Sequence, residues 1–176
     1  MGQTWKYESM FAPFSILLNQ VGIDTVAVDW EKTDTHESIW ETTKKLTLDY
    51  KPDYLFGYCY GSFVCVNAWN PTIKGIIMLD PSSDKKDLSC IFPRNEDVIN
   101  RNTNILKPIP RIPIDKVKCK VDIIYTSEGY LNRINGIQTQ FFKNKKEHII
   151  PDTHHKIMCD KDNVKLLKII TEIVNA

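Results

Sequence analysis

The sequence has no strong net charge and no long apolar run. Its 23 lysines and arginines nearly cancel its 22 aspartates and glutamates, which leaves a formal net charge of +1. No field of one sign therefore draws phosphate backbones or anionic lipids, and we expect neither nucleic acid nor a membrane as a partner. No apolar stretch approaches the roughly 20 residues that span a bilayer, and the first residues lack the pattern of a secretory signal. These absences favour a cytoplasmic protein.

Paired cysteines are missing as well. The five cysteines are scattered, odd in number and without C-x-x-C spacing. This argues against a disulfide framework and a zinc site, so we expect free thiols, no metal and no cofactor. There is also no internal repeat and no second domain boundary. Because 176 residues suffice for one packed core, we expect residues 1–176 to form a single domain.

Short apolar runs alternate with helix-like stretches along the chain. Strands are predicted at Ile23–Asp29, Tyr54–Tyr58, Ile73–Asp80, Val121–Thr126 and Glu147–Pro151, and helices at Ser9–Val21, Thr35–Tyr50, Ser62–Trp69 and Asn163–Val174. This alternation is typical of a mainly parallel sheet, here of about five strands, with helices on both faces. The proline-bearing stretch at 82–116 interrupts the rhythm. A loop of that length predicts a short lid-like excursion, with plain surface irregularity as the alternative.

A glycine-flanked cysteine follows the second predicted strand. Gly57-x-Cys59-x-Gly61 lies directly after an apolar strand and directly before a helix. This is the nucleophile-elbow pattern G-x-S-x-G with cysteine in place of serine, in which a strained turn requires small flanking residues. The helix N-terminus favours a thiolate and an oxyanion, and the backbone N–H of Tyr60 is the expected oxyanion donor. A structural cysteine in a glycine-rich turn remains the alternative.

A cysteine nucleophile needs a base, and two adjacent histidines are placed to supply one. His154 and His155 follow the last predicted strand and precede the last helix. In this topology the connecting loop returns to the sheet edge that carries the elbow. His36 starts a predicted helix and His148 lies in a strand, where packing or solvent exposure is the better interpretation.

Three segments of the chain resemble the α/β-hydrolase superfamily, and the resemblance extends from Ile23 to the end. They are the elbow GYCYGS, the strand ending IIMLDPSS and the closing stretch IIPDTHHKIMCDKDNVKLL. The elbow is similar to the cysteine elbow of dienelactone hydrolases and polyhydroxyalkanoate synthases, and to the serine elbow of thioesterases. The resemblance implies His155, five residues before Asp160, as the catalytic base, with His154 as the alternative.

The resemblance also implies an acid that orients the imidazole, at the end of the next-to-last strand. Glu128 occupies that place in VDIIYTSEGYLN. Asp80, which ends the preceding strand, is the alternative because some relatives carry the acid there. The non-catalytic alternative for Asp80 is helix capping or loop hydrogen bonding, which is common for an Asp before Pro-Ser-Ser.

The family usually begins with three further strands, and the loop after the third supplies a second oxyanion donor. This sequence starts at that loop, where Gly2 or Gln3 would be the remaining donor. We therefore expect either a trimmed sheet or one completed by another subunit, which leaves a homo-oligomer open.

The resemblance implies a hydrolase of an ester, thioester or lactone that acts on a small-molecule acyl substrate. Cys59, His155 and Glu128 would form the triad, with an acyl-cysteine intermediate. Two alternatives remain open at this point. One is an acyltransferase that uses the same intermediate, and the other is a non-catalytic binding protein on a degenerate hydrolase scaffold.

Overall fold

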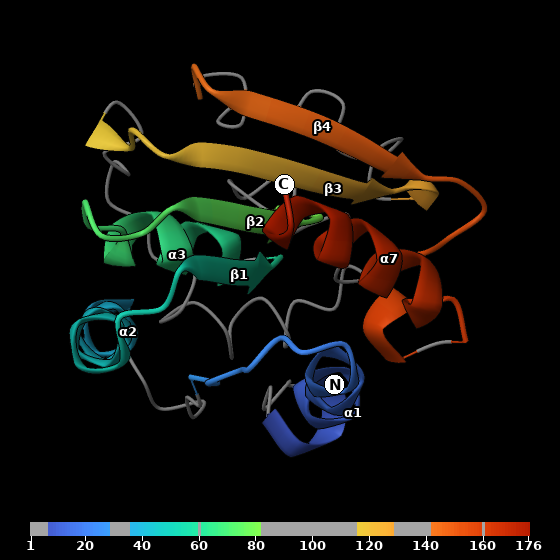
Figure 1. Ribbon diagram of the computed structural model, residues 1–176, viewed down its shortest axis with the longest axis horizontal. Coiled ribbons are helices and arrows are strands. Elements are labelled where there is room, and N and C mark those ends of the chain that lie inside the picture. Colours follow the sequence, from blue (N-terminus) through green and yellow to red (C-terminus); the bar gives the residue numbers. More distant parts are fainter. Residues whose placement is uncertain (1–6, 29–35, 60, 82–115, 129–141, 160) are drawn as a thin grey trace, which may run out of the picture.

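Four parallel strands form the sheet of the protein (Figure 1). The computed structural model describes residues 7–28, 36–59, 61–81, 116–128, 142–159 and 161–176. The strands are β1 (Tyr54–Tyr58), β2 (Gly75–Leu79), β3 (Lys120–Thr126) and β4 (Lys145–Ile150), and they lie side by side in chain order. Every neighbouring pair is parallel. The expected mainly parallel sheet is therefore confirmed, and four of the predicted strands form it.

The helices also follow the predicted pattern. They are α1 (Tyr7–Gln20), α2 (His36–Tyr50), α3 (Gly61–Ala68) and α7 (Asn163–Val174), and a short 3-10 turn η3 (Ile157–Cys159) precedes α7. The turn η3 was not predicted. Among the described residues, no helix combines the length and apolarity needed to cross a membrane.

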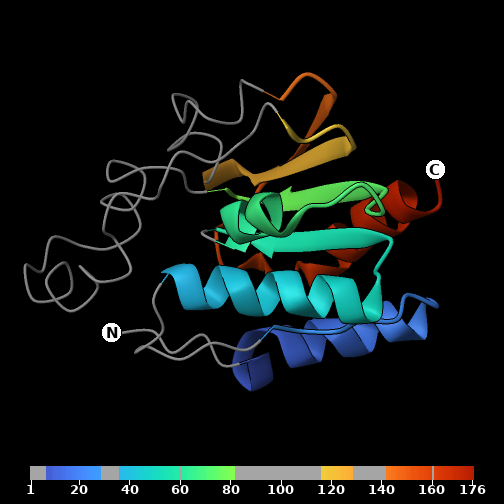
Figure 2. The ribbon, with the colours of Figure 1, turned by 90° about the vertical axis from the view of Figure 1, so that its left-hand side faces the viewer.

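Alternating side chains of the buried strands build two separate cores. In β2, Ile76 and Met78 pack with α3, while Ile77 and Leu79 pack with residues of α1 and α7. Because successive residues of a strand point to opposite faces, a continuous apolar run such as β2 needs helices on both sides. Figures 1 and 2 show these helices on the two faces of the sheet.

The predicted first strand, Ile23–Asp29, is wrong as a strand. Ile23–Val28 is free of regular secondary structure and pairs with no strand among the described residues, and Asp29 lies outside them. Its β-branched residues favour extended backbone, but a strand exists only where a neighbour takes up its N–H and C=O groups. Residues 82–115, nearly all of the expected lid-like excursion, also lie outside the described part.

Candidate active site

The candidate site is built on the turn between β1 and α3, where the backbone of Cys59 is strained. Cys59 has φ of 53°, a conformation that is uncommon for a residue with a side chain. Its N–H donates to the carbonyl oxygen of Leu79 at 2.8 Å, and its carbonyl oxygen accepts the N–H of Ser62 at 3.1 Å. These bonds fix the turn between β2 and the start of α3. The Cys59 side chain is buried, with 7% of the residue exposed.

Close approach of strand and helix explains the glycine at position 57. A Cβ atom added to Gly57 would lie 2.5 Å from the carbonyl oxygen of Gly61 and 2.5 Å from the Cα of Ser62. Those neighbours are backbone atoms, so they have little freedom to give way. The hydroxyl of Ser62 also donates to the carbonyl oxygen of Gly57 at 3.0 Å. The elbow pattern in the sequence therefore corresponds to a tight strand-to-helix turn.

Asp80 places a fully buried carboxylate at the end of β2. Its Oδ1 accepts the backbone N–H of Thr126 at 2.9 Å, and its Oδ2 accepts the Thr126 hydroxyl at 2.7 Å. The residue is 0% exposed and has φ of 43°. A buried carboxylate is tolerated where donors replace its lost water, and Thr126 supplies two of them. The Oδ2 atom of Asp80 also contacts one further group.

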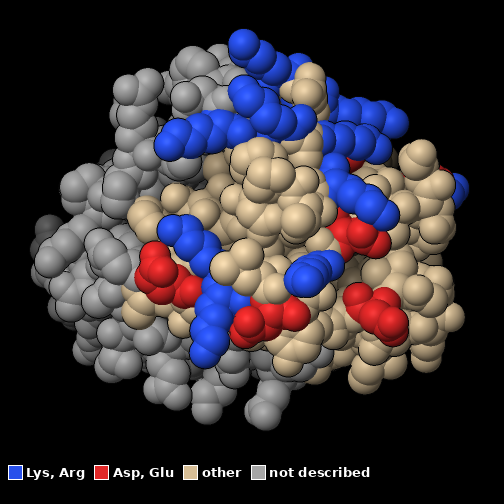
Figure 3. Space-filling view, turned by 60° about the vertical axis from the view of Figure 1, so that its left-hand side comes forward, with Lys and Arg blue, Asp and Glu red and all other residues tan. Residues whose placement is uncertain are grey.

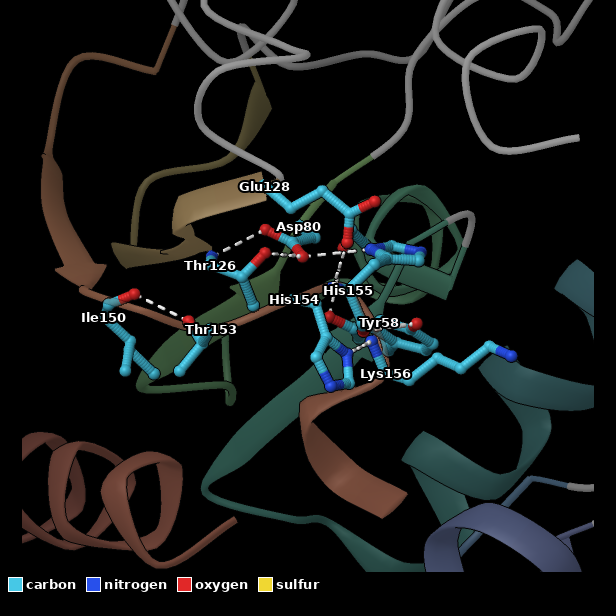
Figure 4. Close-up of polar contacts among 11 residues, drawn as sticks. Tyr58, Asp80, Thr126, Glu128, Ile150, Thr153, His154, His155 and Lys156 are labelled. Atoms are coloured by element: carbon cyan, nitrogen blue, oxygen red, sulfur yellow. Dashed lines mark hydrogen bonds and ion pairs between the residues drawn. The ribbon is translucent and has the colours of Figure 1, made fainter. Parts of the chain in front are cut away.

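That further group is the imidazole of His155 (Figure 4). Nδ1 of His155 lies 2.9 Å from Oδ2 of Asp80. An ionised carboxylate can only accept, so Nδ1 carries a proton and the neutral ring keeps its lone pair on Nε2. The Nε2 atom is buried. This is the tautomer that a general base on Nε2 requires.

Tyr58 brings this histidine to the elbow. The Tyr58 hydroxyl donates to the carbonyl oxygen of His155 at 2.7 Å, and the two rings pack in a tilted contact with centroids 4.7 Å apart. Tyr58 is the last residue of β1 and immediately precedes Cys59. His155 is thus held at the carboxyl end of β1, beside the strained cysteine.

Glu128 contacts the same histidine at a different point. Its Oε2 accepts the backbone N–H of His155 at 2.9 Å, and its own N–H donates to the carbonyl oxygen of Thr153 at 3.3 Å. The Glu128 side chain is exposed. We expected Glu128 to contact the imidazole of His155, and this expectation is corrected. The alternative acid, Asp80, contacts the ring at Nδ1, whereas Glu128 contacts the backbone N–H of the same residue. The reason is local, because the loop after β4 turns the His155 backbone toward β3 and its ring toward β2.

The loop after β4 gives the two adjacent histidines different surroundings. His154 is exposed, and its Nδ1 accepts the backbone N–H of Lys156 at 3.2 Å. Its ring is thereby used in a local turn, whereas the ring of His155 reaches Asp80. The structure thus brings Cys59, Asp80 and His155 to one end of the sheet.

The sequence analysis missed two residues of this site, Thr126 and Tyr58. Each is the last residue of its strand, and the carboxyl ends of parallel strands meet at one end of the sheet. That position in the strands is the signal that could have identified them. The predicted oxyanion donors Tyr60 and Gln3 lie outside the described residues. Within the described part of the chain, no group of three metal-ligating side chains could hold a metal ion.

Comparisons with known proteins show the fold to which this geometry belongs. No family model matches the sequence, and no curated protein matches it. Solved structures do match. A tomato methylketone synthase I complexed with 2-tridecanone has a TM-score of 0.66 at 13% identity, with 92% of this chain and 91% of that chain covered.

Two further structures agree. A mutant of polyneuridine aldehyde esterase has a TM-score of 0.62 at 13% identity, covering 97% of this chain and 94% of that chain. A lipase-esterase related protein from Clostridium acetobutylicum has a TM-score of 0.55 at 12% identity, covering 93% and 90%. The fold is that of the α/β hydrolases in a trimmed form. At these identities the likeness concerns the fold alone.

Proposed function

We propose that the protein hydrolyses an ester, thioester or lactone, with Cys59 as nucleophile, His155 as base and Asp80 as the acid. One observation carries the proposal. The imidazole of His155 is bound through Nδ1 to a buried carboxylate and packs against the ring of Tyr58, the residue that precedes a strained cysteine. A nucleophile, a base and a group that orients the base are the parts of covalent acyl-transfer catalysis.

The chemistry follows from the protonation states. Nε2 of His155 takes the proton of the Cys59 thiol, and the sulfur attacks the substrate carbonyl carbon. The tetrahedral adduct collapses when the leaving oxygen or sulfur departs with the proton from Nε2, which leaves an acyl-cysteine. His155 then takes a proton from water, the resulting hydroxide attacks the thioester carbon, and the carboxylic acid departs as Cys59 regains its proton. Asp80 stays ionised and stabilises the imidazolium in both halves.

The start of α3 supports a thiol nucleophile at this turn. The N-terminus of α3 carries the partial positive charge that favours a thiolate and a developing oxyanion. Cys59 also belongs to the apolar core cluster that includes Phe14, Ile157 and Met158. This apolar surrounding of the cysteine is compatible with an apolar acyl group. Because a thiolate is itself a good leaving group, unactivated amides are poor substrates for this site.

The test is an acyl-enzyme measurement with matched neighbours as controls. We expect p-nitrophenyl esters and acyl thioesters to leave an acyl group on Cys59, detected by intact mass, and to release free acid. Changing His155→Asn should lower kcat by about a thousandfold or more, whereas His154→Asn should change it by less than about threefold. Equal losses from the two histidines, or an acyl group that forms with Cys59→Ala, would refute the assignment. Transfer to an added alcohol in preference to water would instead indicate an acyltransferase.

Thiol labelling supplies a second control. Burial raises the pKa of the Cys65 thiol to about 12, and burial also raises the pKa of Cys119. A raised pKa leaves less thiolate at neutral pH, so both should react slowly with iodoacetamide while the protein is folded. Cys59 is expected to be alkylated faster than Cys65 and Cys119. Alkylation of Cys59 that is unchanged by His155→Ala would contradict activation by the histidine.

A further inference from the structure

A patch of positive charge lies at the amino ends of β3 and β4. Basic side chains gather at the top of Figure 3, the end of the molecule at which Figure 1 places β4, with few acidic side chains among them. Because the strands are parallel, their amino ends lie at the opposite end of the sheet from Cys59, which follows the carboxyl end of β1. The lysines of this lysine patch, all exposed except the half-buried Lys120, are Lys116, Lys118, Lys120, Lys143, Lys145 and Lys146.

Backbone pairing fixes the two halves of the lysine patch beside each other. Val121 of β3 and Lys145 of β4 are partners in the parallel register. The carbonyl oxygen of Asn144 accepts the N–H of Val121 at 3.0 Å, and its side-chain amide donates to the carbonyl oxygen of Lys118 at 3.3 Å. Residues 116–122 and 143–148 are therefore neighbours in space, and the sheet holds their lysines in a defined arrangement.

The acids of these two segments balance the lysines only in part. Residues 116–122 and 143–148 contain six lysines and two acids, Asp122 and Glu147, which gives a formal charge of +4. Since the whole chain has a formal charge of +1, its remaining residues have a formal charge of −3. Positive charge is thus concentrated on one part of a nearly neutral protein.

Both acids already have partners within the patch. The side chain of Asp122 is 2% exposed, and its Oδ1 lies 2.8 Å from Nε2 of His148 and its Oδ2 3.4 Å from Nζ of Lys120. Oε1 of Glu147 lies 2.7 Å from Nζ of Lys145. Three exposed lysines of the patch form no ion pair with any described residue: Lys116, Lys143 and Lys146. Their ammonium groups face solvent and can bind carboxylates of another molecule.

Protection of the sheet edge explains only part of the patch. Charged residues, lysine above all, guard an edge strand against pairing with another chain. This applies to Lys145 and Lys146, which belong to β4. Lys116 and Lys118 precede β3, however, and Lys143 precedes β4. These three lysines lie outside the strands, so edge protection does not account for them.

The segments that lead into the patch do not supply the missing negative charge. Residues 82–115 precede its first half and residues 129–141 its second half, and both lie outside the described part of the chain. Each has a formal charge of +1, from six basic and five acidic residues in the first and a single arginine in the second. We therefore expect the counter-charge to come from another molecule.

The composition and placement of the lysines favour a short acidic polypeptide over a nucleic acid or a membrane. Residues 116–122 and 143–148 contain no arginine, whose planar fork matches phosphate, and no Phe, Tyr or Trp on which bases could stack. Lys145 and Lys146 are consecutive in a strand, so their side chains point to opposite faces of the sheet. A flat bilayer would meet only one of these faces. A long polyanion would also reach the remaining residues, whose formal charge is −3.

We propose that the lysine patch binds a short acidic segment of a partner protein, whose carboxylates pair with Lys116, Lys143 and Lys146. Exposed ion pairs are individually weak, so binding requires several of them at once and weakens with salt. Complementary charge also speeds the encounter of the two proteins. Because the patch and Cys59 lie at opposite ends of the sheet, this binding does not depend on the proposed hydrolase chemistry.

NMR of the wild-type protein with a synthetic hexaglutamate peptide tests the patch without any variant. We expect the amide shifts that the peptide causes to be confined to residues 116–122 and 143–148. The Kd should rise by about tenfold or more between about 20 mM and about 200 mM NaCl, because salt screens exposed charges. No binding at the lower salt concentration, or shifts centred elsewhere on the protein, would overturn the proposal.

Two double variants of equal net charge test the residues. Lys143→Gln with Lys146→Gln removes two charges of the patch, and Lys45→Gln with Lys168→Gln removes two from exposed positions of α2 and α7. Fluorescence anisotropy of the labelled peptide should show at least about a fivefold rise in Kd for the first pair and less than about twofold for the second. Equal losses would indicate unspecific attraction and refute the patch. Circular dichroism checks the fold, and the wild-type NMR result decides the question if a variant does not fold.

A DNA duplex and phosphatidylserine vesicles represent the two other kinds of polyanion. At equal concentrations of negative charge, we expect both to bind more weakly than the hexaglutamate peptide. If either bound more tightly than the peptide and lost this binding in the double variant of Lys143 and Lys146, the patch would belong to that polyanion. An acidic polypeptide as the occupant would then be wrong.

Discussion

Two carboxylates approach His155, and they differ in almost every physical respect. Asp80 is fully buried, accepts both groups of Thr126 and contacts the ring nitrogen. Glu128 is exposed and accepts the main-chain N–H of the same histidine. The electrostatic interaction of a buried charge with its neighbour is weakened little by solvent, whereas water screens the interaction of an exposed charge. The comparison teaches that the role of an acid in this site follows from its burial and from the atom it reaches.

The largest expected effect comes from removing the charge of Asp80. Asp80→Asn keeps the shape of the side chain but no longer stabilises an imidazolium, so kcat should fall by about a thousandfold to ten-thousandfold. Steady-state kinetics on a p-nitrophenyl ester measures the loss, and circular dichroism checks the fold. If Glu128→Gln caused the larger loss, the assignment of the two carboxylates would be reversed.

The next effect concerns the support of Asp80. Thr126→Val removes the hydroxyl donor and leaves the backbone donor in place. The loss of one charge-assisted bond should lower kcat/KM by about tenfold. Thr47→Val is the matched control, because that buried hydroxyl donates to the carbonyl oxygen of Thr43 within α2. An equal loss of activity in both variants would point to general destabilisation and not to the Asp80 carboxylate.

A smaller effect is expected from the tyrosine that holds the main chain of His155. Tyr58→Phe keeps the ring contact with His155 but removes the donor to the His155 carbonyl oxygen, so kcat should fall by about threefold to tenfold. The Tyr54 hydroxyl donates to the carbonyl oxygen of Ile173 at a long distance of 3.5 Å, so Tyr54→Phe should be nearly neutral. The two variants compared in one ester assay decide whether the Tyr58 hydroxyl positions the base.

Much of the fold follows from local sequence pattern, and the choice between the two acids does not. The aromatic run at β1 and the β-branched runs at β2 to β4 predict strands because such residues suit a buried pleated surface. Ile23–Val28 is also rich in β-branched residues, but it pairs with no strand among the described residues, which no local pattern shows. Likewise, Asp80 and Glu128 both lie just after the ends of strands. The pairing of Leu79 with Ile124 brings Thr126 within reach of Asp80, and this register is a property of the assembled sheet.

The smallest effect, and the one that sharpens the comparison most, is expected at Glu128. In Glu128→Gln the amide oxygen can still accept the His155 N–H, so kcat should change by less than about twofold. Glu128→Ala removes the acceptor, and because the backbone N–H is near the surface, water can replace it; we expect a loss of about threefold. Equal kcat in the Gln variant and wild type, with a modest loss in the Ala variant, separates a hydrogen-bond acceptor from an electrostatic partner. A Gln variant as impaired as the Ala variant would mean that the negative charge of Glu128 acts on the imidazole.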